Sequence, residues 1–210
     1  RHVLDQLGPV EFGRLPASKV ELEDVADTAW AWFDEGDATR AVALLEAWFA
    51  PGQALTARHA VLLDTLMDIL HDIGDVRARD ALLATALGQD DVELRVIALH
   101  HRADIEAARG DLDAAWATWQ AIDALDHDNP DNASLEVTLL LERGEYPRAA
   151  TRARYWTGRI EHGEDEGEFT ALLEFFDHVA SDPQAAFARM RADTRRDDGV
   201  RRLELAVPRL

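Results

Sequence analysis

Apolar residues recur every three or four positions along most of the chain, which is the period of an amphipathic α-helix. The segment before Gly74 shows this spacing with Leu62, Leu66 and Ile69. The segment after Gly74 shows it with Ala78, Leu82 and Ala86. Short polar or glycine-containing stretches separate such segments, as expected for turns. The pattern predicts an all-α protein with helices over residues 19–35, 38–50, 56–73, 76–88, 92–109, 112–125, 132–143 and 147–162.

Beyond residue 163 the same period continues. A further amphipathic segment is followed by "SDPQ" (181–184), which has an N-cap serine and a proline in the first turn of a helix. These features predict a fifth, degenerate helix pair over residues 164–196.

The turn within each predicted pair has the same form, a glycine followed by an acidic residue. It occurs in "EGDATRA" (35–41), "IGDVRAR" (73–79), "RGDLDAA" (109–115) and "RGEYPRA" (143–149). The four glycines are 38, 36 and 34 residues apart, a period typical of stacked helical repeats. Glycine can end a helix in the left-handed conformation, and the acid after it can cap the next helix. The Arg-Gly-Asp at 109–111 is therefore predicted to be a helix joint and not a cell-adhesion tripeptide.

Over roughly residues 22–163 the chain resembles tetratricopeptide-repeat proteins. The resemblance rests on the glycine–acid joint, on the period, and on a small residue five positions after the glycine. That small residue is Ala41, Ala115 and Ala149 in three of the pairs. The resemblance implies a right-handed α-solenoid of antiparallel helix pairs. Its parts are an N-terminal arm (1–17), four helix pairs (18–163), the degenerate capping pair (164–196) and a basic C-terminal tail (197–210).

Two features depart from the family pattern. In the second pair Arg79 stands where the small residue belongs, so that either residues 76–81 are shifted by about two positions or that joint is looser. The tryptophan that is usual early in the first helix of each family repeat is replaced by Val25, Leu63, Leu99 and Ala133.

The charge of the chain limits the partners that it can attract. It has 41 acidic and 22 basic residues and a formal net charge of −19. Phosphate backbones and anionic membranes attract positive charge, so we expect neither nucleic acid nor a membrane as partner. Residues 185–210 are the exception, because seven arginines against four acids give them a net charge of +3. Self-association through this basic tail is one predicted interaction.

Several chemical classes are excluded by residues or motifs that the sequence lacks. The absence of cysteine excludes disulfides, thiolate zinc sites and cysteine nucleophiles. The sequence also contains no nucleophile elbow, phosphate-binding loop, dinucleotide fingerprint or HExxH helix. We therefore predict no enzymatic activity and no cofactor. With no long apolar run and no signal-like start, we expect a cytoplasmic protein.

Histidines close to aspartates are the side chains that most suggest a catalytic or metal-binding role. Asp64 and Asp68 stand one helical turn apart near His71, and His100 and Asp104 do so one helix later. Metal ligands could therefore converge there. Acidic stripes are common on so acidic a chain, and His100 lies at the edge of an apolar stripe. We thus predict no metal site and keep a metal-assisted hydrolase only as an alternative.

The family geometry implies where a partner would bind, since the first helix of each pair lines the concave surface. Counting back from each glycine predicts an acidic groove with an aromatic end. Its residues are Trp30, Phe33, Asp34, Asp64, Asp68, His71, Asp72, His100, Asp104 and Thr138. Family members that clamp a terminal carboxylate use lysine, arginine and asparagine at such places, so that ligand class is excluded here.

The resulting prediction is a non-catalytic protein–protein interaction scaffold or adaptor. Its partner would be a protein or peptide segment that is cationic, or mixed basic and apolar, because opposite charge favours encounter and specificity. An alternative is a helical sensor domain that binds a small ligand or peptide in the same groove.

Overall fold

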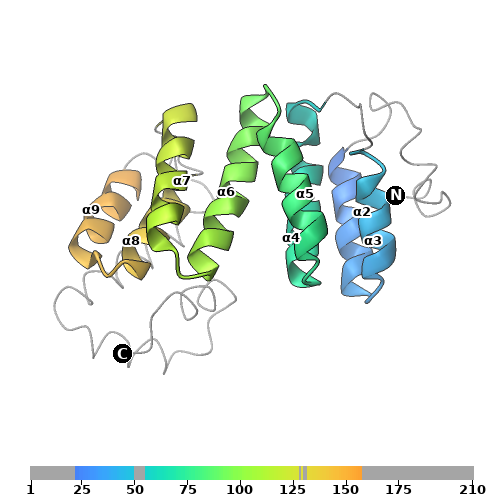
Figure 1. Ribbon diagram of the computed structural model, residues 1–210, viewed down its shortest axis with the longest axis horizontal. Helices are drawn as coiled ribbons and strands as arrows, with labels where there is room; N and C mark the ends of the chain where they lie inside the picture. The colour runs from blue at the N-terminus through green and yellow to red at the C-terminus, as the bar shows by residue number, and fades with distance from the viewer. Residues whose placement is uncertain (1–21, 50–54, 128, 130–131, 158–210) are drawn as a thin grey trace. The chain divides into compact units, whose positions relative to one another are not determined.

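The computed structural model describes residues 22–49, 55–127, 129 and 132–157, and every element in this part of the chain is helical (Figure 1). The elements are α2 (Leu22–Asp34), α3 (Ala38–Glu46), the 3-10 turn η3 (Ala57–His59), α4 (Ala60–Asp72), α5 (Val76–Leu87), α6 (Val92–Ala108), α7 (Leu112–Leu125), α8 (Ala133–Glu142) and α9 (Tyr146–Thr157). The all-α prediction is confirmed for these residues. The predicted arm (1–17), capping pair (164–196) and basic tail (197–210) lie outside them.

Within the described residues the helix boundaries lie within one residue of the predicted ones except at two places, and the predicted helical residues 19–21 and 158–162 lie outside the described residues. Helix α3 ends at Glu46 and not at residue 50, because the chain turns there and packs Trp48 into the core with 2% of its surface exposed. The helix predicted from residue 56 begins with the 3-10 turn η3. In this turn the backbone N–H of Thr56 donates to Nδ1 of the buried His59 at 3.2 Å.

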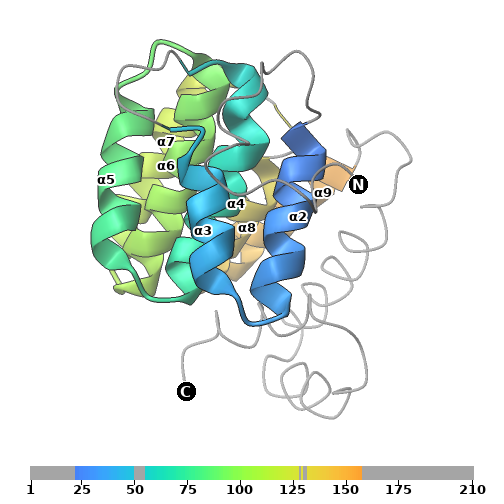
Figure 2. The same cartoon turned by 90° about the vertical axis from the view of Figure 1, so that its right-hand side faces the viewer.

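The chain forms two compact units, and the division between residues 102 and 103 falls within α6. In the first unit α2 packs against α3 and α4, and α4 also packs against α3 and α5 (Figure 2). The first part of α6 adds Leu94 and Ala98 to the core of this unit. The largest fully buried side chains of α3 and α4 in this core are Leu44, Leu45, Leu62, Leu63, Leu66, Met67, Ile69 and Leu70.

In the second unit α8 packs against α7 and α9. The hydroxyl of Thr118 on α7 donates to Oε2 of Glu106 at 2.6 Å, which links α7 to the end of α6. The apolar core of this unit is built from Ala133, Val137, Leu140, Leu141, Ala149, Ala150, Ala153 and Trp156.

Each joint within a helix pair contains a glycine in the left-handed conformation. The φ angles lie between +72° and +89° at Gly36, Gly74, Gly110 and Gly144. At Gly110, the glycine N–H donates to Ala107 O at 2.8 Å, and the next N–H donates to Glu106 O at 3.0 Å. The other three joints repeat this pair of bonds, known as the Schellman motif, which satisfies the last carbonyls of a helix. The Arg-Gly-Asp stretch thus lies at a helix joint.

The acid after each glycine was predicted to cap the next helix. Oδ1 of Asp37, Asp75 and Asp111 accepts a backbone N–H bond of 3.0–3.1 Å from three residues further on, which confirms the prediction at three joints. At the fourth joint the longer Glu145 side chain binds arginines. It accepts from Arg143 Nε at 2.8 Å and from Arg148 at 3.0 Å.

The second helix pair differs from the others at the position of the small residue, five residues after the glycine. In the other three pairs it is a fully buried alanine, at Ala41, Ala115 and Ala149. Arg79 occupies the same place and is only 8% exposed. The glycine joint before it has the same two backbone hydrogen bonds as the other three joints. Both alternatives, a two-residue shift and a looser joint, are therefore wrong. The long side chain is accommodated because its guanidinium lies 3.2 Å from Asp80 Oδ1 and 3.4 Å from His71 Nδ1.

Glu136 is a carboxylate in the interior of the second unit, where only 2% of it is exposed. Its Oε1 accepts from Arg152 Nε and its Oε2 accepts from Trp156 Nε1, both at 2.7 Å. A buried charge is tolerated when it is paired and hydrogen-bonded, and both conditions hold here. Glu136 thereby ties α9 to α8.

We predict that Gly74→Ala destabilises the protein by about 1 kcal/mol, because a Cβ disfavours the left-handed backbone. A Cβ built at Gly74 meets no atom within 4 Å, so backbone conformation alone is tested. The matched control is Gly88→Ala, since Gly88 has φ of −81° and its added Cβ would make only ordinary contacts of 3.5 Å. Urea unfolding of both variants checks this. Equal stabilities would show that the joint does not depend on left-handed glycine.

We also predict that Glu136→Ala costs about 2–4 kcal/mol, since it leaves a buried indole N–H and a guanidinium without their acceptor. The control is Glu46→Ala, at the exposed end of α3, which should change stability by less than about 0.5 kcal/mol. Chemical denaturation measures both. Similar losses in the two variants would contradict the role given to Glu136.

Candidate partner-binding site

Two aspartates of α4 and one histidine of α6 meet in the first unit. Asp64 and Asp68 are one helical turn apart, and their side chains are 57% and 50% exposed. His101 Nε2 lies 2.9 Å from Asp64 Oδ1, and His101 Nδ1 lies 3.9 Å from Asp68 Oδ1. The histidine side chain itself is 12% exposed. We call Asp64, Asp68 and His101 the α4–α6 acid face.

The sequence prediction placed His100 on this surface and missed His101. His100 is half-buried and has contacts of its own, but the residue that meets the α4 acids is the next one. The sequence did contain a signal for His101. Together with the buried Leu94, Ala98 and Ile105 it forms one helical stripe, in which successive residues are four, three and four positions apart. The prediction followed a different apolar stripe of α6. Adjacent residues on a helix point about 100° apart, so a prediction that is wrong by one position names a side chain that faces a different neighbour.

The predicted aromatic end of the groove is an aromatic pair on α2. The ring centroids of Trp30 and Phe33 are 5.6 Å apart, and the rings are nearly perpendicular at 77°. Both side chains are half-buried and pack against the core of the first unit. Asp34, the last residue of α2, is exposed beside them. The pair therefore keeps part of its apolar surface accessible while its position is fixed by packing.

His71 and Asp72 end α4, and both are exposed. The Arg79 guanidinium lies 3.4 Å from His71 Nδ1. A guanidinium can only donate, so this contact requires a lone pair on Nδ1. The contact is a hydrogen bond only in the tautomer whose proton is on Nε2.

In the second unit Asp104 of α6 and Glu142 of α8 are close enough to repel each other. Burial raises the pKa of Glu142, and the charge of Asp104 raises it further. Asp104 is exposed, and Thr138, one turn before Glu142, is half-buried. Asp104, a position predicted for the groove, thus influences the carboxyl group of a neighbouring helix in this unit.

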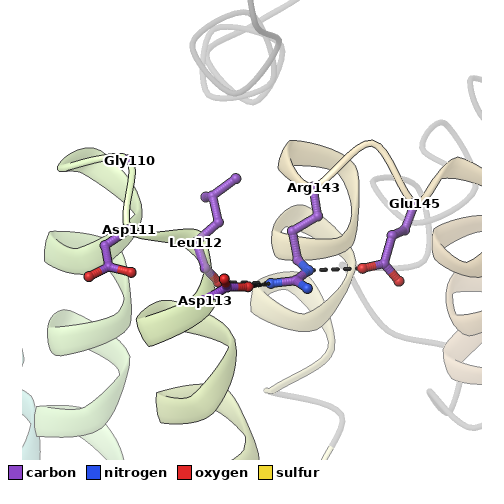
Figure 3. A pocket seen from close by; sticks show the side chains of 6 residues that line it. All are labelled: Gly110, Asp111, Leu112, Asp113, Arg143 and Glu145. Carbon is purple, nitrogen blue, oxygen red and sulfur yellow. Dashed lines mark hydrogen bonds and ion pairs between the residues drawn. The ribbon is translucent and has the colours of Figure 1, made fainter.

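An open pocket in the second unit lies between two successive joints (Figure 3). It is lined by Gly110, Asp111, Leu112, Asp113, Arg143 and Glu145. Arg143 donates through Nε to Glu145 at 2.8 Å, and through NH1 to Asp113 at 2.7 Å and to Leu112 O at 3.2 Å. The bonds to Glu145 and Asp113 raise the pKa of Arg143, and the bonds from Arg143 and Arg148 lower the pKa of Glu145. Arg143 therefore serves as a structural link between the joints.

The aspartates and histidines considered as metal ligands are not gathered into one set. Across the described residues, no three histidine, aspartate or glutamate side chains are placed so that they could hold a metal ion. In the same part of the chain, no helix is both long and apolar enough to cross a membrane.

Comparison of the chain with models of known protein families gives no match, and a search among curated proteins gives none either. Function is therefore inferred from the geometry and charge of the chain itself.

We predict that Glu142→Gln raises stability at pH 7 by less than about 1 kcal/mol, since half-exposed charges interact weakly. The folded-state pKa of Glu142 is raised, so its ionised form costs stability at neutral pH. That cost is lost as the pH falls and the carboxyl becomes protonated in both states. The gain should therefore shrink between about pH 7 and about pH 4. Thermal unfolding across this range measures it, with Glu23→Gln, an exposed acid of α2, as control. A gain that does not depend on pH would refute the assignment.

Proposed function

We propose that the chain is a non-catalytic protein-binding scaffold, a right-handed solenoid of the tetratricopeptide-repeat kind. The recurrence of one joint supports this, because four successive helix pairs close with the same Schellman bonds. Short helix pairs cannot bury their apolar faces alone and do so against neighbouring pairs. Scaffolds built in this way bind partners along the exposed side of the stack.

The observation that carries the proposal is the α4–α6 acid face. Its residues come from the first helices of the second and third pairs, and they meet through their side chains. Asp64 and Asp68 keep half or more of their side chains exposed, so a partner can reach them. Two adjacent carboxylates attract a cationic segment and disfavour acidic ones, which gives faster encounter and charge-based specificity.

The aromatic pair supplies the apolar part of the same surface. Trp30 and Phe33 lie on α2, which packs directly against α4. A desolvated aromatic anchor contributes about 2 kcal/mol or more to binding, whereas an exposed ion pair contributes about 0–1 kcal/mol. The aromatics should therefore set the affinity, and the acids should set the association rate and its salt dependence. The partner segment that fits is mixed basic and apolar.

The remaining predicted positions extend the proposed surface within each unit. In the first unit they are Asp34, His71, Asp72 and His100, and in the second unit they are Asp104 and Thr138.

We predict that Asp64→Asn with Asp68→Asn slows binding of a synthetic peptide of alternating arginine and leucine several-fold at low salt. The reason is the loss of two attractive charges from the encounter surface. The difference should fade near about 300 mM salt, where charges are screened beyond a few ångströms. Stopped-flow or surface-based kinetics on the full chain gives the association rate constants.

A charge-matched control separates the acid face from the overall charge of the protein. Asp90→Asn with Glu93→Gln removes two exposed acids around the start of α6, away from Asp64 and Asp68 along the chain. This control should bind the peptide at close to the wild-type rate. If both double variants slow binding equally, only net charge matters and the proposed face is wrong.

A further inference from the structure

We draw no further inference here: the strongest candidate, the surface patch of α9 around Arg148 and Arg152, carries nothing because Glu145 and Glu136 already pair these two arginines and nothing in the part of the chain that the structure describes shows what covers the patch.

Discussion

The left-handed glycine between two helices is the constraint on which the rest of this structure depends. Four glycines have φ between +72° and +89°, a conformation that residues with a Cβ adopt only at a cost. Because the Schellman bonds fix how the second helix leaves the first, they also decide which side of the first helix is packed. The same register, six residues before a glycine, then holds Trp30, Asp68, Asp104 and Thr138. A backbone rule thereby positions the side chains of the candidate site.

Much of this could be predicted because it follows from local rules. Helix period, glycine joints and aspartate caps depend on residues close in sequence, and the boundaries of α5 and α7 agree with prediction to within one residue. What escaped prediction depends on contacts between helices. Whether His100 or His101 meets the α4 acids depends on how α6 is rotated about its axis toward α4. Arg79 is buried because its guanidinium finds hydrogen-bonding partners nearby. The register of a repeat fixes positions, but it does not say how an unusual residue at such a position is accommodated.

Two charged side chains lie in the interior of the described residues with hydrogen-bonded partners. Glu136 and Arg79 are almost fully buried where apolar or small residues would also fit, and each has hydrogen-bonded partners. Buried ion pairs add little net stability compared with apolar packing, but losing one partner is costly. We therefore expect these residues to favour one packing register, because a shifted register would leave a buried charge without its partner. Arg143 acts in a similar way at the surface, where it holds two successive joints together.

Two pairs of acids lie close together within the units, and this bears on how a cationic partner would be recognised. Asp64 and Asp68 stand one turn apart, and Asp104 raises the pKa of Glu142 from a neighbouring first helix. Such repulsion opposes folding without any gain in packing, a conflict expected where a surface serves binding. A cation bound beside Asp104 and Glu142 would relieve the repulsion, and the pKa of Glu142 would fall on binding.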